Sequence, residues 1–184
     1  RINDAAMSAL IRLVEQISDE STIISLYQSL KLISGGKVES LFPSLLSQSK
    51  ILFPILWNSH YLLLEINLER HEILGFDSLE SNPLSVESIR FDSFESDILP
   101  VKEIRAVLSN WSIQSNLFQY QWVSCPSQLG SNDCGINLVL NLISRRLNKA
   151  PNYHYESEEI RFKFKQMILN GNLDIEYLQT AVLK

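Results

Sequence analysis

Apolar residues recur along the first half of the chain in short runs that are typical of buried strands. Ile51–Leu56, Tyr61–Ile66 and Ile73–Phe76 are three such runs. Strands that are buried on both faces have nearly continuous apolar sequences rather than an alternation of apolar and polar residues. The polar residues 68–71 join the second run to the third as a hairpin turn. Phe118–Val123, which is aromatic and β-branched, predicts one further strand.

Other stretches carry apolar residues at helical spacing. Near the N-terminus, Asn3 or Asp4 can cap a helix whose apolar residues fall on one face. Thr22–Leu30 predicts a short strand or an irregular segment, whereas residues 78–100, rich in Ser, Asp and Glu, predict mainly a loop. Further helices are predicted at Val38–Leu46, Val101–Trp111, Gly135–Leu147, 156–169 and 173–183, with the turn-rich Cys125–Asp133 before the third of them.

The order of these elements is helix, strands, helix, strand, helices, which predicts an α+β fold. A length of 184 residues fits one domain better than two. The first residue is Arg1 rather than Met, so we expect residues 1–184 to be a single domain taken from a longer protein.

The composition narrows the class of protein. Apolar residues make up 45% of the chain and charged residues 20%, which is typical of a soluble globular domain. The net charge of −5, without a long basic run, argues against nucleic acid or an anionic membrane as the main partner. Within residues 1–184, no apolar run is long enough to span a bilayer, and we recognise no signal-peptide pattern. Only Cys125 and Cys134 are cysteines, which favours a reducing compartment, the cytoplasm or nucleus.

Cys134 lies directly before the strongly apolar helix predicted at Gly135–Leu147. The N-terminus of a helix carries roughly half a positive charge and unpaired N–H groups, which lower the pKa of a thiol placed there. Gly135 has no Cβ, so the backbone of a substrate could approach closely. The alternative is that Cys134 is an inert, small apolar residue. Cys125 is expected to be structural, and a disulfide between Cys125 and Cys134 would silence the thiol.

His60 and Asp77 are the candidate partners of this thiol. His60 lies at the start of the second apolar run, where a strand can hold it rigidly beside a cleft, and a nucleophilic thiol needs such a base. Asp77 closes the third run and could fix the tautomer of the imidazole. Gln128, six residues before Cys134, could donate its amide to an oxyanion. Each residue also has a plain structural interpretation: a hydrogen-bonded histidine, a turn-starting aspartate and a polar loop residue.

Taken together, these residues resemble the ubiquitin-like-protein-specific cysteine proteases of clan CE, the family of SUMO and NEDD8 proteases. Their pattern is a His followed by Trp, then an aromatic-Asp-Ser-Leu segment, then Gln and Asp-Cys-Gly. The chain has His60-Tyr61, Phe76-Asp77-Ser78-Leu79, Gln128 and Asp133-Cys134-Gly135 in this order. The spacings of 17 residues from His60 to Asp77 and six from Gln128 to Cys134 also match. Arg1-Ile2-Asn3-Asp4 is similar to a divergent form of the Trp-Leu-Asn-Asp segment that opens the family's domain.

The resemblance implies a papain-like or adenain-like fold with a central mixed sheet flanked by helices and the nucleophile at a helix N-terminus. It implies hydrolysis after the C-terminal Gly-Gly of ubiquitin or a ubiquitin-like modifier, without a metal or organic cofactor. Cys134, His60, Asp77 and Gln128 would be catalytic. The resemblance places Tyr61, Trp57, Asp133 and Gly135 at the substrate, with the Tyr61 ring roofing a tunnel where the family usually has Trp.

Two other functions remain open at this point. Acyltransferase effectors of the same clan use a similar His, acidic residue and Cys to transfer acetyl groups, and they need an inositol phosphate and acetyl-CoA. They usually have Glu where this chain has Asp77, and the sequence shows no basic cluster suited to a polyphosphate. An inactive relative could bind a modifier without cutting it, although all four catalytic positions are present here. The partners are expected to be SUMO, NEDD8 or ubiquitin and their conjugates, bound by a monomer. The setting is then intracellular, or the host cytosol for a bacterial effector.

Overall fold

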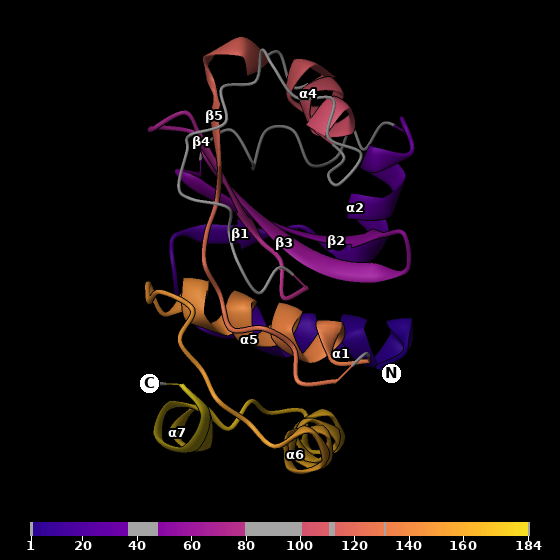
Figure 1. Cartoon of the computed structure of the whole chain (residues 1–184), viewed down its shortest axis with the longest axis vertical. Helices are drawn as coiled ribbons and strands as arrows, with labels where there is room; N and C mark the ends of the chain where they lie inside the picture. The colour runs from indigo at the N-terminus through magenta and orange to yellow at the C-terminus, as the bar shows by residue number, and fades with distance from the viewer. Residues whose placement is uncertain (1, 37–47, 80–100, 111–112, 131, 184) are drawn as a thin grey trace.

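A computed structural model of the chain describes residues 2–36, 48–79, 101–110, 113–130 and 132–183. Its centre is a five-stranded sheet in the order β1-β2-β3-β4-β5. The inner pairs β2–β3 and β3–β4 are antiparallel, whereas the outer pairs β1–β2 and β4–β5 are parallel. Helices cover both faces of this mixed sheet (Figure 1). The α+β class, with a mixed sheet flanked by helices, is therefore confirmed.

The strands lie where the apolar runs predict them. Residues 68–71 form the turn between β3 and β4, as predicted. β2 and β3 are one residue longer than their apolar runs at each end, because Trp57 pairs with His60 beside the hairpin and Lys50 pairs with Asn67 at the opposite end. The bounds are β1 (Ser21–Ile23), β2 (Lys50–Trp57), β3 (His60–Asn67), β4 (Glu72–Phe76) and β5 (Gln119–Trp122).

The continuous apolar sequences arise because both faces of the sheet are buried. On β3, Tyr61 and Leu63 belong to the core that includes α1 and α5, while Leu62 and Leu64 belong to the core that includes α2 and α4. Successive side chains of a strand point to opposite faces, so a strand between two helical layers has no polar face.

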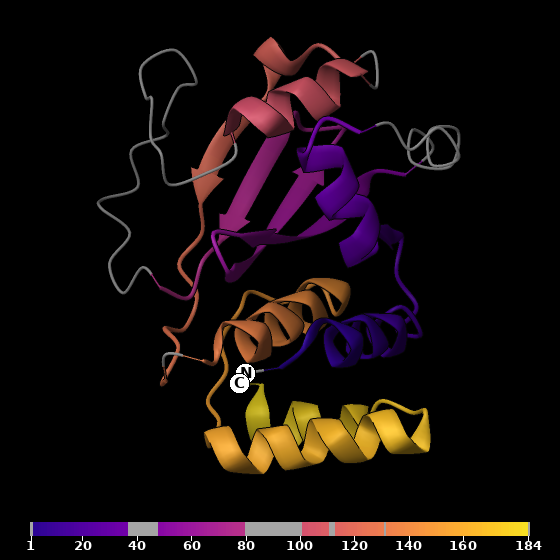
Figure 2. The same cartoon turned by 90° about the vertical axis from the view of Figure 1, so that its right-hand side faces the viewer.

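The helices form two layers below the sheet and one above it in the orientation of Figure 1. α2 and α4 cover one face, α1 and α5 cover the other, and α6 with α7 lie beyond α1 and α5, as the turned view of Figure 2 also shows. The bounds are α1 (Asp4–Val14), α2 (Leu26–Ile33), α4 (Val101–Asn110), α5 (Cys134–Arg146), α6 (Ser157–Asn170) and α7 (Ile175–Tyr177), followed by a π-helical turn, η3 (Leu178–Val182); a 3₁₀ turn, η2 (Ser115–Leu117), precedes β5.

One sequence prediction in the N-terminal part is wrong. Thr22–Leu30, expected as a short strand or an irregular segment, is split between β1 and the start of the helix α2. The reason is a capping box, in which Ser25 accepts a bond from the backbone of Gln28 and the Gln28 side chain accepts one from the backbone of Ser25. Such a box satisfies N–H groups at a helix start and stabilises even a short helix. The helix predicted at Val38–Leu46 and most of the loop at 78–100 lie outside the described residues.

No helix among the described residues is both long enough and apolar enough to cross a lipid bilayer.

Candidate active site

His60 is placed by the tight hairpin between β2 and β3. The two turn residues, Asn58 and Ser59, both have positive φ angles of 47° and 64°. Two-residue hairpins require this conformation because its twist matches that of the flanking strands. Trp57 and His60 are the last cross-strand pair before the turn, so His60 is the first residue of β3. The His60 side chain is 15% exposed, which holds the ring firmly while leaving part of it accessible.

Asp77 follows the last residue of β4, the strand next to β3. Its Oδ1 atom lies 2.6 Å from Nε2 of His60 and also accepts a bond of 2.8 Å from the backbone N–H of Leu79. A side-chain bond to the N–H two residues later is an Asx turn, which fixes the carboxylate with respect to its own backbone. The carboxylate is therefore rigid where it meets the imidazole.

Cys134 is the first residue of α5 and is 5% exposed. Its thiol hydrogen-bonds with His60 and receives the backbone N–H groups of Tyr61 and Gly135. The N-cap residue Asp133 makes no side-chain bond to the first turn of α5. Because its carboxylate turns away, the N–H groups at the start of the helix are left to the thiol and to whatever lies beside it.

The electrostatics of the pair favour ionisation of the thiol. Burial raises the pKa of Cys134, but the hydrogen bond and charge of His60 and the N–H groups of Tyr61 and Gly135 outweigh it, so the pKa lies below its usual value. Burial lowers the pKa of His60, but the hydrogen bonds and charges of Asp77 and Cys134 outweigh it and raise the pKa to about 9. Both shifts stabilise a thiolate beside an imidazolium, which is the reactive form of a cysteine nucleophile.

Gln128 belongs to the loop that precedes α5, and it is tied to the residue after Asp77. Its backbone N–H donates to the carbonyl of Ser78 at 3.0 Å, and the Ser78 hydroxyl donates to its Oε1 atom at 3.3 Å. Hydrogen bonds thus connect the loop before Cys134 to the turn that follows β4. The structure brings together Cys134, His60 and Asp77 in direct contacts and ties Gln128 to this group through Ser78.

Three of the residues expected at the substrate are buried and packed within the protein. Tyr61 is 1% exposed within the core, and its hydroxyl donates to Asp4 at 2.5 Å. Gly135 is buried, and a Cβ there would lie 2.8 Å from the Met7 side chain, so the missing side chain makes room for α1.

Asp133 is the third. It is 2% exposed, and its carboxylate accepts bonds from Arg161 at 2.5 Å, Ser157 at 2.5 Å and the backbone of Gly130 at 3.1 Å. This residue therefore anchors the loop before Cys134 to α6, because a buried carboxylate must be paired and fully hydrogen-bonded. A contact of Tyr61, Gly135 or Asp133 with the substrate stays a prediction.

Trp57 is half-buried against the core on the α2 and α4 side of the sheet. Its indole N–H is buried and has no acceptor among the described residues. The role of Trp57 at the substrate stays a prediction.

Sequence reasoning missed the residues that hold the site in place. In the sequence, Ser78 stands out only as one residue of the aromatic-Asp-Ser-Leu segment. Asp4 and Arg161 carry no local signal of their contacts, because their partners lie 57 and 28 residues away in the chain. Tyr61 and Asp4 come together only in the folded protein, where α1 packs beside β3.

Cys125 and Cys134 are both free thiols. Cys125 hydrogen-bonds with the Asn141 side chain and with the backbone of Asp77, and its burial raises its pKa to about 11. Asn141 lies about two turns beyond Cys134 on α5, a distance of roughly 10 Å along the helix. A disulfide between the two cysteines does not fit this arrangement, since bridged Cα atoms lie within roughly 7 Å.

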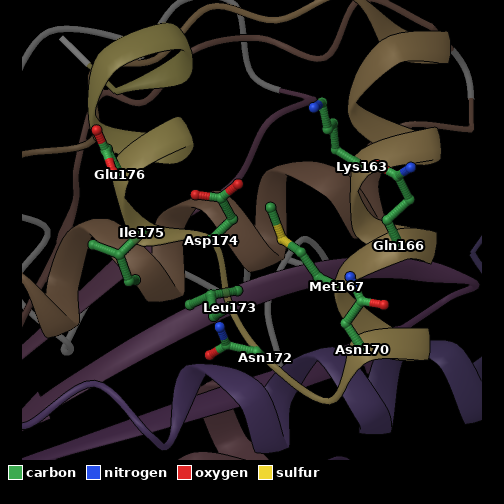
Figure 3. A pocket seen from close by; sticks show the side chains of 9 residues that line it. All are labelled: Lys163, Gln166, Met167, Asn170, Asn172, Leu173, Asp174, Ile175 and Glu176. Atoms are coloured by element: carbon green, nitrogen blue, oxygen red, sulfur yellow. The ribbon is translucent and has the colours of Figure 1, made fainter.

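Two hollows lie on the α6 side of the molecule, apart from His60 and Asp77. One, of about 340 Å³, is lined by Lys163, Met167, Asp174 and their neighbours between α6 and α7 (Figure 3). The other, of about 310 Å³, is an apolar groove between α1 and α6. Among the described residues, no group of three or more His, Cys, Asp or Glu side chains could hold a metal ion.

When the chain is compared with known protein families, its sequence matches the model of one family. Residues 43–168, more than half of the chain, match the sequence model described as "Ulp1 protease family, C-terminal catalytic domain". No protein with a curated description matches the chain.

Several solved structures share the fold. The SUMO protease Ulp1 with its catalytic cysteine oxidised to a sulfonic acid has a TM-score of 0.69 at 19% identity, covering 92% of this chain and 78% of that one. The Ulp1 protease domain in complex with Smt3, the yeast ortholog of SUMO, has a TM-score of 0.69 at 18% identity, covering 92% and 77%. The Xanthomonas campestris effector XopD bound to ubiquitin has a TM-score of 0.60 at 12% identity, covering 90% of each chain.

Proposed function

Because the chain belongs to the Ulp1 protease family, a family of cysteine proteases, we propose that it hydrolyses the peptide or isopeptide bond after the C-terminal Gly-Gly of ubiquitin or a ubiquitin-like modifier. The observation that carries this proposal is the contact series from Asp77 to His60, 2.6 Å, and from His60 to the thiol of Cys134. The solved structures of similar fold that hold Smt3 and ubiquitin support a modifier as the substrate class.

In the proposed reaction, the Cys134 thiolate attacks the carbonyl carbon of the terminal Gly. The negative charge that develops on the carbonyl oxygen is stabilised by the backbone N–H of Cys134, at the start of α5, and by the amide of Gln128. His60, held as an imidazolium by Asp77, donates its proton to the leaving amine, and the C–N bond breaks. A thioester on Cys134 remains.

The second half of the reaction reverses these roles. His60, now neutral, removes a proton from water, and the resulting hydroxide attacks the thioester carbonyl. The C–S bond breaks, and the thiolate leaves beside the reprotonated imidazole. The modifier is released with a free carboxylic acid, which loses its proton to the solvent. Throughout both steps, Oδ1 of Asp77 accepts a hydrogen bond from Nε2 of His60. The other nitrogen of the His60 ring therefore remains directed at the thiol.

The test uses ubiquitin, SUMO and NEDD8, each with a C-terminal propargyl amide that traps a cysteine nucleophile. We expect at least one of them to form a covalent adduct located on Cys134 by peptide mass spectrometry. Cys134→Ala should form none. Cys125→Ala is the matched control and should react like the wild type, since Cys125 lies against Asn141 and its pKa is raised to about 11.

The same panel decides which modifier is preferred, from the relative rates of adduct formation. If the wild-type protein forms no adduct with any of the three and hydrolyses no modifier conjugate, the proposal is wrong. Consumption of acetyl-CoA in place of modifier reactivity would instead indicate the acyltransferase function.

A further inference from the structure

Ser78 makes two contacts with Gln128, although 50 residues separate them in the chain. Its carbonyl oxygen accepts the Gln128 backbone N–H at 3.0 Å, and its hydroxyl donates to Oε1 of the Gln128 side chain at 3.3 Å. Ser78 is 2% exposed, so water does not compete freely for its hydroxyl. One residue therefore holds both the backbone and the side-chain amide of Gln128.

These contacts decide which end of the amide is free. A carboxamide carries an acceptor oxygen on one arm and two N–H donors on the other. Because the Ser78 hydroxyl occupies Oε1, the Nε2 donors are directed away from Ser78. An oxyanion needs a donor, and an amide turned by half a rotation would present an oxygen that repels the developing negative charge.

The backbone at Ser78 is itself fixed by the neighbouring residues. Oδ1 of Asp77 accepts the N–H of Leu79 at 2.8 Å, and this Asx turn sets the direction of the peptide groups on both sides of Ser78. The same oxygen binds His60. Residues 77–79 thus orient the base through Asp77 and the amide of Gln128 through Ser78, from a single turn at the end of β4.

We propose that Ser78 is a positioning residue for the reaction, and that its hydroxyl orients the Gln128 amide so that Nε2 donates to the oxyanion. This role rests on the proposed function, because it requires an acyl transfer through a tetrahedral oxyanion. Ser78 acts through Gln128 and does not touch the reacting atoms.

The experiment compares wild type, Ser78→Ala, Gln128→Ala and the double variant. Steady-state hydrolysis is measured on SUMO, NEDD8 and ubiquitin that carry 7-amino-4-methylcoumarin at the C-terminus, using the one that the wild type cleaves fastest. Loss of one oxyanion donor lowers kcat about 100-fold to 1,000-fold, so we expect about 100-fold for Gln128→Ala. We expect about 10-fold for Ser78→Ala with KM little changed, and the double variant should equal Gln128→Ala.

A second readout separates positioning from general damage to the site. Alkylation of Cys134 by iodoacetamide uses the thiolate but forms no oxyanion, so Ser78→Ala should leave its rate within about twofold of wild type. Ser144→Ala is the matched control: Ser144 is equally buried, 1% exposed, and its hydroxyl bonds to Leu140 at the far end of α5. It should change neither rate.

Each contrary result is distinct. If the effects of Ser78→Ala and Gln128→Ala multiply in the double variant, Ser78 does not act through Gln128 and the proposal is overturned. If alkylation falls in step with kcat, Ser78 merely supports the fold of the site, which also overturns it. Failure of the wild type to cleave any of the three coumarin substrates, together with the absence of an adduct in the propargyl amide panel, would refute the proposed function itself, before any variant is compared.

Discussion

Replacing Asp77 by Asn should move the alkaline limb of the pH–activity profile to lower pH. Asp77 holds the His60 ring at 2.6 Å, and its hydrogen bond and charge are major contributions to the raised pKa of that imidazole. The isosteric Asn keeps a polar group in the same place but carries no charge. The imidazolium, which gives its proton to the leaving amine, is then less favoured.

The size of the effect follows from the two pKa values. Raising the pKa of His60 from 6.5 to about 9 favours the imidazolium by about 3 kcal/mol. At pH 8, a group with a pKa of about 9 is about nine-tenths protonated, whereas at the ordinary value of 6.5 only about 3% is protonated. Complete loss of the shift would thus lower the rate at pH 8 about 30-fold through ionisation alone. Cys134 also contributes to the shift, so this is the upper limit.

The assay is kcat/KM between pH 5.5 and 10 on a modifier carrying a C-terminal aminocoumarin, because this parameter reports the ionisation of the free enzyme. In the wild type, activity should rise as Cys134 ionises and fall as His60 loses its proton at about pH 9. In Asp77→Asn, the fall should come at least one pH unit earlier. A loss that is equal at every pH, with the alkaline limb in place, would refute the electrostatic role and leave only an orienting one.

Asp174→Asn is the matched control for this substitution. Asp174 caps α7 by accepting the N–H of Tyr177, and Asn can accept that bond equally well. The residue lies on the far side of α5 from the sheet, so its profile should coincide with that of the wild type.

The raised pKa of His60 also predicts how the stability of the fold depends on pH. A group whose pKa is raised on folding stabilises the folded state fully below its unfolded value and loses this contribution as the pH rises through its folded value. In Cys134→Ala, where only Asp77 raises the pKa of His60, the free energy of unfolding should fall as the pH rises above about 6.5. Adding Asp77→Asn should flatten this dependence, and an unchanged slope in urea denaturation would contradict it.

Two further substitutions test the scaffold of the site. Gly75→Ala should lower the free energy of unfolding by about 1–3 kcal/mol, because a Cβ there would lie 2.2 Å from the Tyr120 hydroxyl and 2.7 Å from the Trp122 ring. An unchanged midpoint of urea denaturation would contradict this packing. Arg161→Met should lower the free energy of unfolding by about 2–3 kcal/mol, since it leaves the Asp133 carboxylate, which is 3% exposed, without the cation that it pairs with. Adding Asp133→Asn should restore part of that loss, and a purely additive further loss would show that the two charges are not coupled.

The amino-acid sequence contains most of the information about the secondary structure. β2, β3 and β4 are read from continuous apolar runs, because a strand covered on both faces needs an apolar residue at every position. The helix α5 is read in the same way, and the position of Cys134 directly before it follows. α2 is missed because eight residues give too little periodicity, even though Ser25 and Gln28 carry the signal of its capping box.

The candidate site is predicted in part. His60, Asp77, Gln128 and Cys134 are of residue types that thiol catalysis uses, and their order and spacing, which resemble those of the clan CE proteases, single them out. The residues around them were not assignable from spacing. Tyr61 follows His60 in the chain, yet the pleat of β3 directs it into the core, where Asp4 of α1 accepts its hydroxyl bond.

The sequence alone determined the fold class, the strands of the sheet and the group of four polar residues that suggests a cysteine protease. The tertiary structure was needed to show that Asp133 and Gly135 serve packing, and that Cys125 lies beside Asn141 of α5, away from Cys134. The difference arises because these contacts join residues that are far apart in the sequence. Patterns along the chain record burial and local backbone preference, whereas the partner of a buried charge or hydroxyl is set by which elements pack together. Ser78 and Gln128, 50 residues apart, meet only once the turn after β4 and the loop before α5 lie side by side.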